Sequence, residues 1–143
     1  MNDRVVVFSK EEFMILAAAS GIRQMYGFSV GEKVDDEEAV QTMYQLAGRG
    51  VLLSLDGRFQ IQEPVCSWFL QIKNAKTTLD VHKRSGKKCI IYIGEFAVKV
   101  SLSRRGNGML EVQAMLQGDV WKHLTEEGWI PEGKEKQHDL GGY

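Results

Sequence analysis

The segment that decides the fold is Asp35–Ile72, which reads DDEEAVQTMYQLAGRGVLLSLDGRFQIQEPVCSWFLQI. Its first part predicts a helix, because four acidic residues precede apolar residues at helical spacing and a Gly-Arg-Gly stop follows. Its middle predicts a β-hairpin that turns at Asp56-Gly57. Pro64 then opens a further helix with one apolar face, made of Val65, Trp68, Phe69 and Ile72. Helix, hairpin and helix in this order resemble a winged-helix unit.

The register of the hairpin is predicted from its side chains. A two-residue turn at Asp56-Gly57 would set Leu53 opposite Gln60. A three-residue loop, with the glycine supplying a positive φ, would set Leu53 opposite Phe59 and would gather the apolar side chains on one face. We therefore expect the three-residue loop. The expected apolar face comprises Leu53, Phe59 and Ile61, and we expect Trp68 to be buried against it.

The chain before this segment predicts a short strand and a buried helix. Arg4–Phe8 is β-branched and predicts an edge strand or an extended entry segment. Ser9 and Glu12 match a capping box, and apolar residues at helical spacing follow as far as Gly21. The glycine-containing segment 22–34 predicts a short helix and a loop, with Val34 as a hydrophobic staple on the next helix.

The chain after this segment changes from helical to alternating spacing, which predicts a four-stranded antiparallel sheet. Its strands are expected at Thr77–Lys83, Lys88–Ile93, Phe96–Leu102 and around Leu110–Ala114, polar on one face at least at the ends. A short last helix follows, capped by Asp119 and closed by Gly128. The predicted fold class is thus α+β, a winged-helix-like N-terminal half packed with this sheet and a short C-terminal helix.

Composition places the chain among globular proteins with one domain. It has 143 residues, of which 43% are hydrophobic and 26% charged. We expect a single α+β domain over residues 1–130 and a disordered tail over 131–143, which is charged and has little to bury. No apolar run is long enough for a signal peptide or a membrane span, which predicts a cytoplasmic protein without membrane insertion. Reduced thiols at Cys66 and Cys89 fit that compartment.

Catalytic and metal chemistry finds no support in the sequence. His82, His123 and His138 share no metal-ligand spacing, and neither cysteine has a second cysteine two residues away. The chain has no nucleophile elbow, phosphate loop or dinucleotide fingerprint. The carboxylates of Asp35–Glu38 are better explained as partners of a helix dipole than as a metal site. We therefore expect no catalytic residue, no cofactor and no metal, and a small-molecule enzyme is only a third alternative.

DNA binding is the main alternative, because of the winged-helix-like order. The net charge is −1, so the whole molecule offers no field that attracts nucleic acid. The helix that leads into the hairpin begins with four carboxylates, which DNA phosphates would repel. Basic pairs occur at Lys83-Arg84, Lys87-Lys88 and Arg104-Arg105, all at turns between predicted strands. We expect no nucleic acid partner, and a winged-helix transcription regulator stays the alternative.

The order of elements resembles the EspG family of cytosolic chaperones in type VII (ESX) secretion. The resemblance begins at the first helix, Phe13-Met14-Ile15-Leu16, and continues through the helix end and strand at Leu46–Leu52. Gly57-Arg58-Phe59, the apolar helix Val65–Ile72, an extended segment at Leu79 and the strands Ile90–Ile93 and Phe96–Leu102 follow in the family's order. The likeness covers roughly residues 9–116. A family member is about twice as long and has two similar halves, so this chain resembles one half.

The resemblance implies a non-catalytic protein-binding domain, a secretion chaperone or adaptor whose partner is a protein or a secreted cargo. It also implies a homodimer, because two copies about a two-fold axis would restore the two halves. Trp121 and Trp129 stand near a terminus, where a small domain has little core left to bury them. We expect the partner to contact these tryptophans and the turn between the last two strands, at Arg104, Arg105, Asn107, Trp121 and Trp129.

Overall fold

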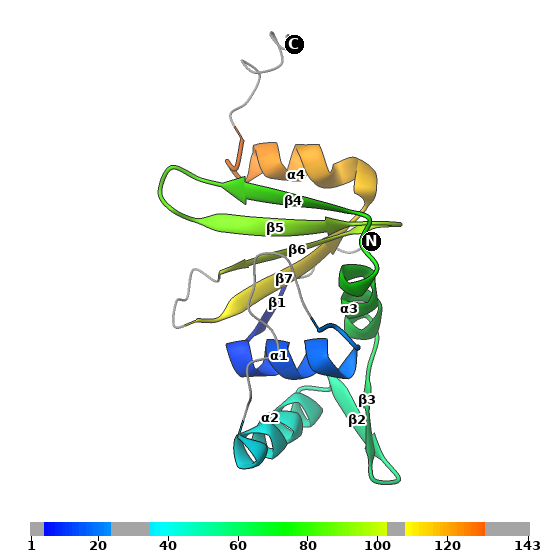
Figure 1. Ribbon diagram of the computed structural model, residues 1–143. Coiled ribbons are helices and arrows are strands. Elements are labelled where there is room, and N and C mark those ends of the chain that lie inside the picture. Colours follow the sequence, from blue (N-terminus) through cyan, green and yellow to red (C-terminus); the bar gives the residue numbers. More distant parts are fainter. Residues whose placement is uncertain (1–4, 24–34, 103–107, 131–143) are drawn as a thin grey trace, which may run out of the picture.

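The computed structural model describes residues 5–23, 35–102 and 108–130 and has the predicted α+β fold (Figure 1). None of the helices in these parts of the chain has the length and apolar content that crossing a membrane requires. The elements, in chain order, are β1 (Val5–Phe8), α1 (Lys10–Ala19), α2 (Asp36–Gly48), β2 (Leu52–Leu55), β3 (Arg58–Ile61), α3 (Val65–Lys73), β4 (Thr77–His82), β5 (Lys88–Ile93), β6 (Ala97–Leu102), β7 (Leu110–Met115), a 3₁₀ turn η1 (Gln117–Asp119) and α4 (Val120–Glu126).

The main sheet is antiparallel and has five strands, in the order β1-β7-β6-β5-β4. The predicted four-stranded sheet lacked β1, which pairs with β7 through Val6 and Val112. The sequence showed β1 as a possible edge strand, but its partner lies more than a hundred residues further along the chain. Successive side chains of β1 point to opposite faces of the sheet, so Val6 and Phe8 are buried on one face while Val5 lies exposed on the other.

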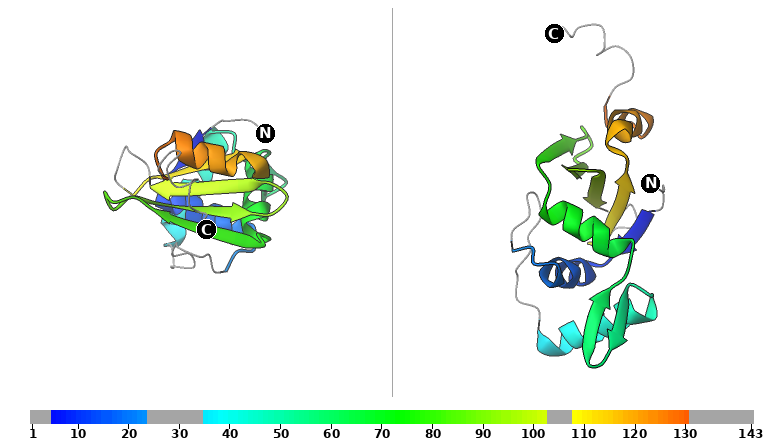
Figure 2. Two further views of the ribbon diagram at one scale, coloured as in Figure 1. Left: turned by 90° about the horizontal axis from the view of Figure 1, so that it is seen from above. Right: turned by 90° about the vertical axis from the view of Figure 1, so that its right-hand side faces the viewer.

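Helices cover both faces of this sheet (Figure 2). On one face, α1 and α3 form the larger hydrophobic cluster, in which Phe69 of α3 packs against Phe8 and Phe13 with ring centroids 6.2 and 5.1 Å apart. On the other face, α4 buries Val120 and Leu124 against the sheet. The molecule therefore has three layers at the sheet, with α2 and the hairpin beyond α1 at the end away from α4 (Figure 1).

Local signals set the helix ends largely as predicted. Ser9 and Glu12 form the capping box, with the Glu12 amide donating to the Ser9 hydroxyl at 3.0 Å and the Ser9 amide to the Glu12 carboxylate at 2.8 Å. The helix after Pro64 buries the expected face, and Trp68 is 2% exposed. Asp119 does precede α4, but its side chain makes no capping hydrogen bond, so that part of the prediction was wrong.

The predicted hairpin register was wrong. The turn has two residues, Asp56 and Gly57, with φ of 52° and 75°, and it pairs Leu53 with Gln60. Positive φ at both positions is the geometry of a two-residue hairpin turn, which Asp-Gly favours. Phe59 packs against the core, whereas Leu53 is 43% exposed and does not contribute to that face. Because β2 has leucines at adjacent positions, no register can bury them all.

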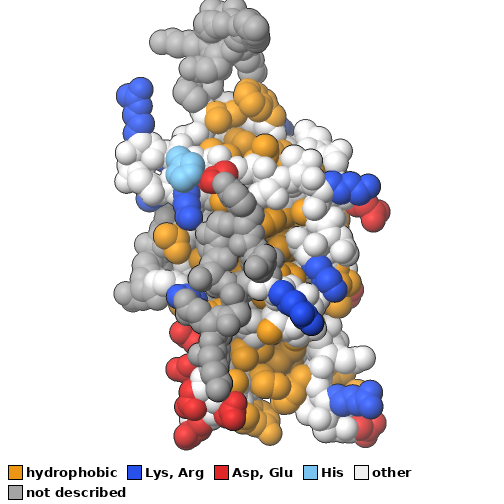
Figure 3. Space-filling model, viewed as in Figure 1, with side chains coloured by type: hydrophobic (Ala, Val, Ile, Leu, Met, Phe, Trp, Pro, Cys, Tyr) orange, Lys and Arg blue, Asp and Glu red, His pale blue; other side chains and the backbone are white. Residues whose placement is uncertain are grey.

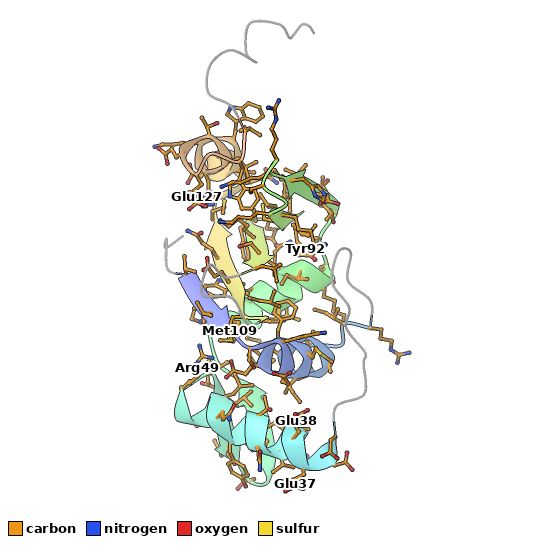
Figure 4. All side chains as sticks on the ribbon, turned by 90° about the vertical axis from the view of Figure 1, so that its left-hand side faces the viewer. Glu37, Glu38, Arg49, Tyr92, Met109 and Glu127 are labelled. Atoms are coloured by element: carbon orange, nitrogen blue, oxygen red, sulfur yellow. The ribbon has the colours of Figure 1, made fainter. Side chains whose placement is uncertain are left out.

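Arg49, just after α2, ties this outer end of the molecule to the main sheet (Figure 4). Its guanidinium donates to the buried Glu12 carboxylate at 2.8 Å and to the Val7 carbonyl at 2.7 Å, and it lies 5.2 Å from the centroid of the Phe8 ring. The predicted order of helix, hairpin and helix is present, and Arg49 connects the end of the first of these helices to β1 and α1. The likeness of this order to a winged helix stays a prediction.

Three predictions fall wholly or largely on residues outside the described ranges: the short helix and staple of segment 22–34, of which only residues 22 and 23 are described, the turn residues Arg104, Arg105 and Asn107, and the disordered tail 131–143.

Candidate functional site

The predicted binding residues that the structure describes do not share one environment. Trp121 lies on α4 and is 55% exposed. Trp129 is only half-buried and packs against the hydrophobic cluster beneath α4. Its ring stacks under the ammonium of Lys83, 4.5 Å from the ring centroid. Trp129 therefore serves the packing of the C-terminal helix, whereas Trp121 is presented to solvent.

A hydrophobic surface that the sequence analysis did not single out lies between α2 and the hairpin. We call it the α2–hairpin surface and define it by Val40, Met43, Tyr44 and Phe59. Val40 and Tyr44 are 51% and 65% exposed, one helical turn apart, and Tyr44 meets Phe59 edge-on with ring centroids 5.9 Å apart. Figure 3 shows hydrophobic side chains gathered at this end of the molecule, with acidic side chains along one border.

A second candidate site is a cleft over the face of the sheet that α4 covers only in part. We call it the sheet cleft; its volume is about 740 Å³. This volume lies within the range of ligand-binding clefts, roughly 300–1,000 Å³. Its lining comprises Val5, Val7, Lys83, Ser85, Gly86, Lys87, Lys88, Lys99, Ser101, Leu102, Glu111, Glu127 and Trp129.

Strand register explains why one half of this sheet face is polar. Side chains of directly paired residues share a face, so Gln113 and Lys99 lie beside each other, as do Glu111 and Ser101. These two pairs belong to two rows of side chains that run across the sheet from strand to strand. On β5 and β4 both rows consist of hydrophobic side chains, and α4 packs on that half of the face. The rows are Val5, Gln113, Lys99, Ile91, Leu79 and Val7, Glu111, Ser101, Cys89, Val81.

The strongest electrostatic feature of the sheet cleft is the buried Lys99. Its side chain is 6% exposed, and its ammonium lies 2.8 Å from both the Glu127 carboxylate and the His123 Nε2 atom. His123 Nε2 lies 3.3 Å from the same carboxylate oxygen. Figure 4 shows Glu127 at the end of α4, on the side that faces the sheet. A charged partner satisfies the buried ammonium, so this cluster fixes the end of α4 to β6.

The cluster lowers the pKa of Glu127, whereas burial raises the pKa of the neighbouring Cys89. Burial would raise the pKa of the Glu127 carboxyl, but the hydrogen bond and charge of Lys99, with His123 and Trp129, outweigh burial and hold that pKa below its ordinary value. Burial raises the pKa of the Cys89 thiol to about 11, and the nearby lysines offset only part of this effect. Cys89 is thus a packing residue and not a nucleophile.

The described residues assemble no catalytic constellation that we can assign. His82 pairs with Asp80 on an exposed strand, and His123 is held by Lys99 and Glu127. No group of three or more metal-ligating side chains occurs in the described ranges. Sequence reasoning missed Lys99, although its position within the buried strand β6, between Val98 and Val100, was a usable signal of a partnered lysine.

No known protein family has a model that matches this chain, and no curated protein matches it.

Proposed function

We propose that the protein is a non-catalytic, cytoplasmic protein-binding domain that acts as a chaperone or adaptor, as its resemblance to the EspG family implies. The observation that supports this proposal best is the α2–hairpin surface. A partner protein that contributes apolar side chains would cover it.

Single exposed hydrophobic residues are common on protein surfaces, but the residues of this surface lie next to one another. Val40 and Tyr44 share one face of α2, and Tyr44 contacts Phe59 across the gap between the helix and the hairpin. Leu53 and Leu55, at 43% and 51% exposure, add apolar groups on the other side of the hairpin. Aromatic residues that are rigid and apolar are the side chains that most often anchor protein interfaces.

A variant of Tyr44 tests the proposal. We expect the tagged full chain, purified from its native cells, to carry a protein in near-equal amount, and Tyr44→Glu to lose it, because a carboxylate at an apolar contact must be desolvated. Gln45→Glu is the matched control, since it adds the same charge at the adjacent exposed position of α2. A protein that remains bound to Tyr44→Glu, or one that both variants lose, would refute a role for this surface.

The first partner to test is a second copy of the chain. The resemblance implies a homodimer, and a two-fold axis through the α2–hairpin surface would bury the same residues from both copies. Light scattering on the full chain should then give a mass near twice the 16.1 kDa of the monomer. Tyr44→Glu should give the monomer mass. A monomer at micromolar concentration would leave a different protein as the partner.

A DNA-binding regulator is the alternative, supported by the order of helix, hairpin and helix. The residues Asp36, Glu37 and Glu38 form the first turn of α2 and are exposed, which opposes an approach to phosphates. Fluorescence anisotropy with duplex DNA at about 150 mM salt decides between the two, since specific complexes are typically near 10⁻⁸ M or tighter. Sequence-selective binding in that range would overturn the protein-binding proposal.

A further inference from the structure

We propose that the sheet cleft binds an extended peptide segment that carries carboxylate side chains and belongs to the partner protein. This inference rests on the proposed protein-binding function. It adds a second contact surface, distinct from the α2–hairpin surface, and names the chemistry of the segment that fits there.

Charge is the first reason. Four lysines line the sheet cleft, Lys83, Lys87, Lys88 and Lys99, against two glutamates, Glu111 and Glu127. Glu127 already neutralises Lys99 at 2.8 Å, so the remaining lining is positive although the whole chain has a net charge of −1. Lys87 lies exposed at the turn between β4 and β5. A cleft of this sign attracts an anionic segment.

A buried hydroxyl on the floor of the cleft is the second, independent reason. Ser101 is 5% exposed, and its hydroxyl has no hydrogen-bond partner among the residues that the structure describes. A buried hydroxyl without a partner costs free energy, so such groups are normally satisfied by protein, water or a ligand. Ser101 lies on β6, two residues from Lys99 and therefore on the same face of the strand. A carboxylate oxygen of a ligand above this floor could accept a hydrogen bond from the Ser101 hydroxyl and would lie among the lysines that line the cleft.

The shape and the apolar part of the lining favour a peptide. The cleft reaches from β1, through β7 and β6, to the turn before β5, a width of about 14 Å at the usual strand spacing, which about four residues of extended chain would cross. Val5, Val7 and Leu102 line it beside the lysines, so apolar and acidic side chains would both find contacts. Nucleic acid fits less well, because Lys83 already covers one face of the Trp129 ring, on which a base would otherwise stack.

Anisotropy with two matched peptides tests the proposal on the full chain. The probe is a fluorescein-labelled six-residue peptide of alternating glutamate and valine, and its control replaces each glutamate with glutamine. We expect the glutamate peptide to bind about tenfold more tightly than the glutamine peptide. Lys87→Glu should weaken its binding by about tenfold, whereas Arg58→Glu, the same charge change at the exposed tip of the hairpin, should leave it within about twofold.

Ser101→Ala separates binding from folding. Removing a buried hydroxyl that has no partner should leave the thermal midpoint unchanged or raise it, while the glutamate peptide should bind about threefold or more weakly. The proposal is overturned if binding does not saturate by about 1 mM, if both peptides bind equally, or if Arg58→Glu weakens binding as much as Lys87→Glu. Tighter binding of a labelled oligothymidylate would also overturn it. Loss of the partner from Tyr44→Glu alongside any of these results would leave the protein-binding proposal intact.

Discussion

Gly94, at the turn between β5 and β6, shows how one residue sets a local arrangement. A Cβ at this position would meet the side-chain amide of Gln71, which is buried on α3. The turn is further fixed by hydrogen bonds from the Gly94 amide to the Phe96 carbonyl at 2.9 Å and from the Gln117 side chain to the Gly94 carbonyl at 2.7 Å. The end of the Gln71 side chain must therefore shift before a Cβ can be admitted at Gly94.

We therefore predict that Gly94→Ala lowers the free energy of unfolding by about 1 kcal/mol, because the group that must move is the end of a flexible side chain. The double variant Gly94→Ala, Gln71→Ala should lose less than the sum of the two single variants, because truncating Gln71 removes the clash. Urea denaturation measures all three. Gly118→Ala is the control, since nothing lies within 4 Å of a Cβ there, and it should be close to neutral. Strict additivity would show that the contact with Gln71 does not limit this position.

Glu127 gives a prediction about pH. Its pKa is lowered in the folded protein, so its contribution to stability is present above the pKa of the unfolded chain and is lost as the pH falls through the folded value. Glu127→Gln should therefore cost about 1 kcal/mol at neutral pH, a small value because the side chain is 41% exposed. The difference from wild type should disappear in acid. Glu126→Gln, the adjacent exposed carboxylate, should show a smaller difference at neutral pH; an equal one would contradict the role of Lys99.

At the scale of elements, α3 is the helix on which the larger hydrophobic cluster depends. Trp68 is 2% exposed and belongs to that cluster together with Phe69 and residues of the sheet. We predict that Trp68→Ala costs about 3–5 kcal/mol in chemical denaturation, through lost burial and the cavity it leaves. A cost below about 1 kcal/mol would mean that the site collapses fully or that the helix does not face the core. The exposed Leu70 of the same helix provides the control, since Leu70→Ala should be mild.

Elements whose signals are local could be predicted from the sequence. The capping box at Ser9 and the apolar face after Pro64 depend on residues within one or two turns, and both appear in the structure. The pairing of β1 could not be predicted, because its partner β7 is distant in sequence and a run of valines fits any free edge. The hairpin register failed for a related reason: patterning favoured one face, and the positive φ values at Asp56 and Gly57 decided otherwise.

The candidate site was less predictable than the fold. Val40 and Tyr44 stand at the same helical spacing as Met43 and Ala47, and that spacing does not show that Val40 and Tyr44 are exposed while Met43 and Ala47 pack against the core. The sheet cleft joins residues from β1, β6, β7 and the end of α4, so its lining exists only once the sheet order is known. Of the tryptophans predicted to bind, Trp121 is exposed and Trp129 packs beneath Lys83, a difference that the sequence does not show.

At the scale of the whole molecule, the near-zero net charge conceals an uneven distribution. The exposed carboxylates of Asp35–Glu38 stand at the start of α2, whereas the lysines of the sheet cleft line the cleft together with Glu127 and Trp129, which follow α4. Helices α2 and α4 lie at opposite ends of the molecule (Figure 1). The apolar α2–hairpin surface lies at the same end of the molecule as these carboxylates, because Val40 and Tyr44 belong to the same helix. These surfaces suit a partner that is apolar at one contact and acidic at another. The net charge of the whole chain would not predict an acidic partner.

The most direct test of the central proposal is contact at Tyr44 itself. A photo-crosslinking amino acid at position 44 of the full chain, activated in the native cells, should join one recurrent protein, either a second copy or a different partner. The same group at Ala18, an exposed position on α1, is the control and should not join it. The proposal predicts a single strong product at position 44 that Val40→Glu abolishes. Equal labelling at both positions, or a product that persists in Val40→Glu, would contradict it.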